Sequence, residues 1–339
     1  MNLELLGITV LWTFLYGYLI VASIDFGAGF FAYYGKITNK DHIINNLISR
    51  YLSPVWEVTN VFFVFFFVGI VGFFPSTAYY YGTALLIPGS IAIILLAIRG
   101  SFYAFGNYGS RDNIIYLFLY GATGLLIPAS LSTALTISEG GFLSVDDNKV
   151  TFLTKELLTS PYSWSVVALS IVSVLFISAA FLTYYADRAN DSEARNILRR
   201  FSLFWSPPTI IASLLVFVSL REHNQLHFDK AVGEYWWMFA LSLICFGAAS
   251  LLIYQKQKFG TAFVLVMLQF FFAFFGYGAS HLPYILYPYI TLQESVTNET
   301  MATALVIVFI LGLLMLIPSL YLLMKLFLFD ADYIKGNKK

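Results

Sequence analysis

Two acidic side chains lie within apolar stretches that are long enough to cross a membrane. Asp25 falls in the stretch 6–34, and Glu57 lies near the start of the stretch 54–74. An ionised carboxylate inside a bilayer is costly unless it is paired or hydrated, and such residues usually mark proton or ion pathways. We therefore predict a proton path that uses both acids. The alternatives are a satisfied structural acid at Asp25, and a Glu57 that is favoured by its helix N-terminus and reaches the membrane interface.

Polar and small residues near the two acids would support such a path. We select Ser23, Thr59, Asn60 and Arg99 as polar support, and Gly27 and Gly29 as positions of close helix packing. Arg99 ends the third apolar stretch, so it is either a counter-ion for one of the two acids or an anchor at the inner membrane face. If Asp25 is structural, Ser23 or Arg99 is its expected partner.

The composition is that of a membrane protein. Of 339 residues, 59% are hydrophobic and only 11% charged, and the mean hydropathy is +0.77. These values exclude a water-soluble enzyme, a disordered chain and a nucleic-acid-binding protein. The single cysteine, Cys245, excludes a disulfide framework, a CxxC zinc site and an iron–sulfur cluster.

The elements that must position these acids are apolar helices. About 20 apolar residues are needed to cross the hydrocarbon core, and nine stretches meet this requirement. They are residues 6–34, 54–74, 77–98, 114–138, 163–186, 201–220, 235–254, 261–286 and 302–329. The predicted fold is therefore an all-α, multi-pass membrane protein, with two four-helix bundles and one peripheral helix.

The basic residues orient these helices. With nine spans, fifteen Lys and Arg residues fall on one side and four on the other. By the positive-inside rule, the N-terminus lies outside and the C-terminus in the cytoplasm. The longest outer loop divides the chain, so the predicted units are a first bundle, the outer loop, a second bundle, and the ninth helix with its tail. Their bounds are 1–138, 139–162, 163–290 and 291–339.

The sequence offers little for haem ligation. Mid-membrane haems need His, Met or Cys as axial ligands. Three of the four histidines, His42, His223 and His227, are in predicted loops, and His281 is near the outer end of the eighth span. The possible axial ligands at suitable depth face no histidine; they are Met238, Met267, Met315 and Cys245. We expect no haem and no metal to be ligated by this chain.

Several short motifs, in this order, resemble subunit II of cytochrome bd-type quinol oxidases. Residues 23–29, Ser-Ile-Asp-Phe-Gly-Ala-Gly, are similar to that family's Gly-Phe-Asp-x-Gly-x-Gly, and residues 54–57, Pro-Val-Trp-Glu, are similar to its Pro-x-Trp-acid. An Arg-Gly pair at 99–100 and a Tyr-Pro pair at 287–288 also match. The chain departs from the family pattern at Ser23 and Ile24, where Gly-Phe is usual, and at Glu57, where Asp is usual.

The resemblance implies a partner, subunit I, that holds two b-type haems, haem d and the quinol site. It implies that this chain ligates no haem, packs against subunit I in the bacterial cytoplasmic membrane, and supplies part of a proton path for oxygen reduction. A structural quinone, a small single-span accessory subunit and membrane lipids are further expected partners; nucleic acid is not. Two alternatives stay open: a proton-coupled secondary transporter and a purely structural membrane subunit.

Overall fold

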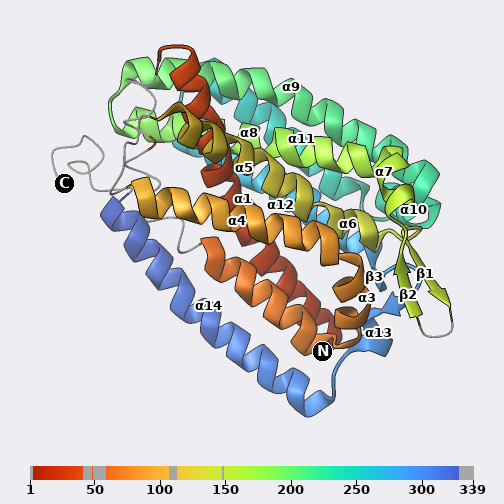
Figure 1. Cartoon of the computed structure of the whole chain (residues 1–339). Helices are drawn as coiled ribbons and strands as arrows, with labels where there is room; N and C mark the ends of the chain where they lie inside the picture. The colour runs from red at the N-terminus through yellow and green to blue at the C-terminus, as the bar shows by residue number, and fades with distance from the viewer. Residues whose placement is uncertain (1–2, 41–47, 49–58, 107–112, 147–148, 328–339) are drawn as a thin grey trace.

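The computed structural model describes residues 3–40, 48, 59–106, 113–146 and 149–327. Helices dominate and lie side by side in one bundle (Figure 1). In the first half they are α1 (Leu3–Ile37), an unlabelled helix (Thr59–Phe73), α3 (Ser76–Ala84), α4 (Leu86–Gly106), α5 (Ile114–Leu131) and α6 (Thr133–Ser138). In the second half they are α7 (Thr154–Thr159), α8 (Pro161–Arg188), α9 (Ser192–His223), α10 (Gln225–Gly233), α11 (Trp236–Tyr254), α12 (Phe259–His281), α13 (Leu292–Ser295) and α14 (Glu299–Phe327).

Within the described residues, seven helical segments are long and apolar enough to span a membrane. An eighth results if α3 and the first part of α4, which are bent by 76° at Leu85, form one broken span. The helix Thr59–Phe73 is apolar but shorter. The predicted span 54–74 begins outside the described residues. A multi-pass helical membrane protein is thus confirmed.

Most predicted spans coincide with helices to within a few residues, except that α9 begins at Ser192, well before the predicted start at residue 201. They correspond to α1, to α5 with α6, and to α8, α9, α11 and α14. The Pro207-Pro208 pair lies inside α9 and does not end that helix. Ser160, before Pro161, caps α8 by accepting a hydrogen bond from the amide of Ser163.

The third and eighth predicted spans differ from the structure. The stretch 77–98 is not one straight helix, because Pro88 cannot donate a hydrogen bond to the carbonyl of Ala84 and is tolerated only in the first turn of a new helix. The stretch 261–286 is helical only to His281. Leu282 is extended before Pro283, as residues preceding proline prefer, so the predicted helix over 282–286 was wrong.

Two small antiparallel sheets lie at one end of the bundle, which an all-α prediction did not include. Strands β1 (Leu143–Asp146) and β2 (Lys149–Phe152) form one sheet, and β3 (Tyr284–Leu286) pairs with β4 (Ile290–Thr291) in the other. Figure 1 shows both at the same end as α7, α10 and α13.

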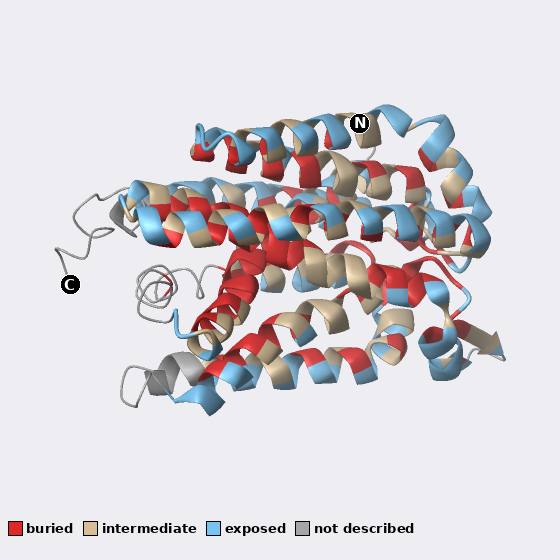
Figure 2. Ribbon diagram, turned by 90° about the horizontal axis from the view of Figure 1, so that it is seen from above, coloured by how far each residue is buried: buried red, intermediate tan, exposed pale blue. Residues whose placement is uncertain are grey.

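Helix α8 lies at the centre of the fold. In the most apolar 18 residues of α8, 67% of residues are buried, whereas at most 33% are buried in the corresponding stretch of each of the other six long apolar helical segments. The middle of α1 is also buried and packs on α5 and α8. Figure 2 shows buried residues concentrated on inner helices and exposed ones on the outer faces. An ionisable group in the middle of α1 therefore has protein, not water, around it.

Candidate functional site

Asp25 on α1 forms a fully buried ion pair with Arg99 on α4. The Arg99 Nε donates to Asp25 Oδ2 at 3.0 Å, and the side chains are 1% and 0% exposed. The second carboxylate oxygen, Oδ1, accepts a hydrogen bond of 3.1 Å from the hydroxyl of Tyr120 on α5. We call Asp25, Arg99 and Tyr120 the inner cluster.

The guanidinium of Arg99 makes hydrogen bonds with all three of its nitrogens and packs against two aromatic rings. Its Nη1 donates to the Tyr120 carbonyl at 2.7 Å and its Nη2 to the Asp25 carbonyl at 2.6 Å. The guanidinium carbon lies 4.0 Å from the centre of the Tyr120 ring and 5.2 Å from that of Phe26. Stacking on aromatic faces and forked donation suit arginine and would not suit lysine. Arg99 is therefore the counter-ion of Asp25 and not an anchor at the membrane interface.

Glycines let three helices close around this pair. A Cβ at Gly124 would lie 2.2 Å from the carbonyl oxygen of Phe26, and one at Gly29 would lie 2.7 Å from that of Tyr120. A Cβ at Gly27 would meet Ser178 of α8 at 2.4 Å. The helices α1, α5 and α8 thus approach with backbones nearly in contact, which leaves no space for bulk water beside the ion pair.

The other predicted site residues differ in their exposure. Ser23 and Thr59 are buried, and Asn60 is partly exposed. Glu57 lies outside the described residues, so the predicted pairing of the two acids stays a prediction. Sequence reasoning missed Tyr120, because one tyrosine among twenty-three carries no distinguishing signal.

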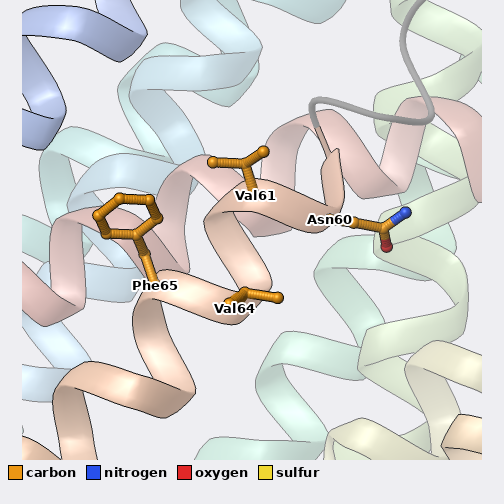
Figure 3. Close-up of a pocket in the computed structure, with 4 residues that line it drawn as sticks. All are labelled: Asn60, Val61, Val64 and Phe65. Carbon is orange, nitrogen blue, oxygen red and sulfur yellow. The ribbon is translucent and has the colours of Figure 1, made fainter.

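A shallow hollow lies near the beginning of the helix Thr59–Phe73. It is lined by Asn60, Val61, Val64 and Phe65, and Figure 3 shows all four side chains on one helix. Apart from Asn60, the lining side chains that the structure describes are apolar, so they offer few polar groups to fix a ligand.

A second buried group of ionisable residues lies at the end of the bundle that carries the small sheets. Glu139 follows α6, His227 is on α10, and His281 ends α12. Glu139 Oε1 lies 2.9 Å from the Nδ1 of His227 and 3.3 Å from that of His281. The Tyr277 hydroxyl also donates to Oε1, and the Asn224 amide donates to Oε2 at 2.9 Å. We call Glu139, His227 and His281 the outer cluster.

The carboxyl of Glu139 is held in its charged form. Burial by itself would raise its pKa, but the charge of His281 and hydrogen bonds from both histidines outweigh burial. The pKa of Glu139 consequently lies well below its ordinary value of 4.5. Sequence reasoning did not connect these three residues, since each comes from a different segment and no spacing links them.

The described histidines lie in two close-packed arrangements. The rings of His227 and His281 lie 5.1 Å apart with both Nδ1 atoms turned toward Glu139, too close for a porphyrin between them. The ring of His223 is stacked between Phe142 and Tyr162 at 5.0 and 5.1 Å. His42 lies outside the described residues. A porphyrin therefore does not fit between the rings of His227 and His281 as the structure places them.

The fold and its buried ionic clusters define a multi-pass helical protein of the membrane. The model of the family described as cytochrome bd terminal oxidase subunit II matches residues 3–327, nearly the whole chain. The chain therefore belongs to this family, and it is a subunit of a bd-type oxidase, which is an oxidoreductase.

Two relatives agree with this assignment. The putative cytochrome bd menaquinol oxidase subunit II of Bacillus subtilis (strain 168) is 32% identical over 343 residues, which cover 98% of each chain. The structure of bd oxidase from Geobacillus thermodenitrificans contains a chain that is 59% identical, with a TM-score of 0.86, and the match covers 97% of this chain and 100% of that one.

Family membership decides one choice that the sequence left open. An oxidase subunit is correct, and a stand-alone transporter is not. Because this chain belongs to the subunit II family, its partner is a subunit I. The two subunits form a haem-carrying complex in the bacterial cytoplasmic membrane.

Proposed function

We propose that this chain is the subunit of a quinol oxidase that ligates no haem, packs against subunit I and supplies part of a proton path from the cytoplasm. The complex oxidises quinol and reduces oxygen to water, with two b-type haems and haem d in subunit I. The B. subtilis relative is named a menaquinol oxidase, and we propose menaquinol as the substrate here. A structural quinone and a single-span accessory subunit complete the proposed assembly.

We propose nine spans, arranged as two four-helix bundles and a peripheral ninth helix, with the unit bounds given above. The ends of the described chain support an odd number of crossings, because the start of α1 and the end of α14 lie at opposite ends of the bundle (Figure 1). The fifteen-to-four distribution of basic residues supports a cytoplasmic C-terminus.

The inner cluster carries the proposal for proton uptake. Asp25 is a carboxylate buried inside a membrane span, a placement that is usually functional. Protons for oxygen reduction would pass Glu57 near the inner surface, then Asp25, and continue into subunit I. The Tyr120 hydroxyl on Asp25 offers a further group that exchanges protons.

One observation favours a second role for Asp25. Both of its carboxylate oxygens are bonded, and its partner Arg99 is completely buried. An ion pair of this kind ties α1 to α4, as a structural acid would. A simple Asp25→Asn substitution cannot separate the two roles, because it leaves a buried guanidinium without its counter-charge, which typically costs about 3–5 kcal/mol.

The double variant Asp25→Asn/Arg99→Gln separates them, because it removes both charges together and keeps groups that can hydrogen-bond each other. If Asp25 relays protons, the complex assembles with native haem content but quinol-driven oxygen uptake falls at least ~10-fold, equivalent to about 1.4 kcal/mol on the limiting barrier. Native turnover in the assembled double variant would remove Asp25 from the proton path and leave it as the structural tie.

A further inference from the structure

The outer cluster brings together the three side chains of a familiar metal-binding set. The ligand atoms of Glu139, His227 and His281 all lie within 4.8 Å of one another, and the side chains are 0%, 2% and 10% exposed. They come from three separate segments: the connection after α6, the helix α10 and the end of α12. Two imidazoles and one carboxylate are a common ligand set of zinc in proteins.

Surrounding residues orient two of these ligands. The Nε2 of His227 lies 2.8 Å from the Ser280 hydroxyl and 3.2 Å from the Tyr277 carbonyl. When Nε2 donates its proton to that carbonyl, the Nδ1 that faces Glu139 carries a lone pair. The amide of Asn224 fixes the other oxygen of Glu139. Such outer contacts on a histidine and a carboxylate are typical of metal sites, where they set ring orientation and tautomer.

From this geometry we propose that the outer cluster binds one divalent transition-metal ion of the zinc class. Glu139 Oε1 and the Nδ1 atoms of His227 and His281 are the protein ligands. Mg²⁺ and Ca²⁺ are excluded as the preferred ions, because they take oxygen ligands almost entirely. A fourth position is open to the Tyr277 hydroxyl or to water.

The distances suit this role after a small adjustment. Bonds of zinc to nitrogen and oxygen near 2.0–2.2 Å place tetrahedral ligand atoms roughly 3.4 Å apart. The two distances from Glu139 Oε1, 2.9 and 3.3 Å, are already near that value. The two histidines must close toward each other, and His281 is the most exposed of the three side chains and has its Nε2 without a hydrogen-bond partner. Its ring can therefore turn without breaking a bond at that nitrogen.

The bound ion would fasten the outer loop to the second half of the chain. The carboxylate position follows α6, whereas both imidazoles belong to segments after residue 224. The competing description is a cluster held by shared protons alone, in which Glu139 accepts hydrogen bonds from both histidines, Tyr277 and Asn224. A metal would replace the protons between Glu139 and the histidines.

The test uses the intact oxidase complex, purified without a histidine tag. Zinc is removed with a chelator, ZnCl₂ is added back, and bound zinc is counted by mass spectrometry alongside haem. The variants are His281→Gln and His227→Gln. The matched control is His223→Gln, since His223 lies on the same side of the molecule but stacks between Phe142 and Tyr162.

We expect one zinc per complex that is present in the native protein and in the control, with affinity reduced at least ~10-fold in both cluster variants. Zinc-edge X-ray absorption of the native complex should show two imidazole ligands. The proposal is overturned if the native complex takes up no zinc at about 10 µM free metal, or if zinc uptake is unchanged in an assembled cluster variant. The native measurement decides the matter even where a variant fails to assemble.

Discussion

At the scale of single residues, the molecule places two buried acids, Asp25 and Glu139, in opposite surroundings. Asp25 is paired with an arginine that is always charged, and Glu139 with histidines whose charge depends on pH. Both carboxylates are fully bonded, so neither is an uncompensated charge in the interior. The outer cluster can therefore respond to acid or to a metal.

Substitutions at Asp25 and at Arg99 should have strongly coupled effects on the stability of the complex. Asp25→Asn and Arg99→Gln should each destabilise the assembled complex by about 3–5 kcal/mol, because each leaves one buried group without its partner. The double variant should lose clearly less than the sum of the two, as is usual for residues in contact. Thermal release of haem from the purified complex measures this. Additive losses would mean that the ion pair contributes nothing to stability.

The depressed pKa of Glu139 predicts that the folded complex loses stability as the pH falls. Its pKa is depressed in the folded chain, so its contribution is complete above the ordinary value of 4.5 and is lost as the pH falls below that value toward the folded pKa. Between pH 5.5 and 3.5, chelator-treated native complex should therefore lose stability more steeply than Glu139→Gln, by at most about 1.4 kcal/mol per pH unit. Glu156→Gln, which changes an exposed acid of α7, should keep the native slope. Equal slopes for all three proteins would contradict the depressed pKa.

At the scale of helices, the length of the apolar stretches was sufficient to predict most spans. The prediction failed at prolines, which interrupt helices within apolar stretches. A prediction from hydropathy alone extends a helix through Pro88 and another through Pro283, but the helices bend or end near these prolines. Proline is apolar enough to fit the pattern but has no amide hydrogen to donate to the helix. Arg99 was predicted as one of two alternatives, and only the packing of α4 against α1 and α5 chose between them. The outer cluster could not be predicted, because its three residues become neighbours only when distant segments fold together.

The close approach of α1 and α5 gives a prediction at this scale. Gly124→Ala should reduce assembly of the complex, because the added Cβ would lie 2.2 Å from the carbonyl of Phe26 and next to Arg99. Gly72→Ala is the matched control, as its Cβ would make ordinary contacts with Leu305 at 3.4 and 3.6 Å. Haem per milligram of purified complex is the measurement. Native yield from Gly124→Ala would mean that the two backbones are farther apart than described.

At the scale of the whole molecule, the two clusters lie in different parts of the bundle. The outer cluster is at the end that carries the small sheets, and the inner cluster is within the packed centre of α1, α4 and α5 (Figure 1). If the basic residues mark the cytoplasmic side, protons for oxygen reduction enter from the end opposite to the sheets. The proposed proton path and the proposed metal site then serve opposite faces of the membrane.

This orientation can be checked by labelling cysteines in intact cells. In a Cys245→Ser background, cysteines replace the exposed residues Lys155, in the predicted outer loop, and Gln257, between α11 and α12. Without the buried Arg99, fourteen of the other eighteen basic residues are assigned by the sequence to the side of Gln257, so the positive-inside rule predicts that side to be cytoplasmic. A membrane-impermeant maleimide should therefore label the Lys155→Cys protein in intact cells, and the Gln257→Cys protein only after the cells are opened. The unsubstituted background, which should stay unlabelled in both conditions, is the control. Labelling of Gln257→Cys alone in intact cells would reverse the orientation, and labelling of both would mean that the number of crossings between them is even.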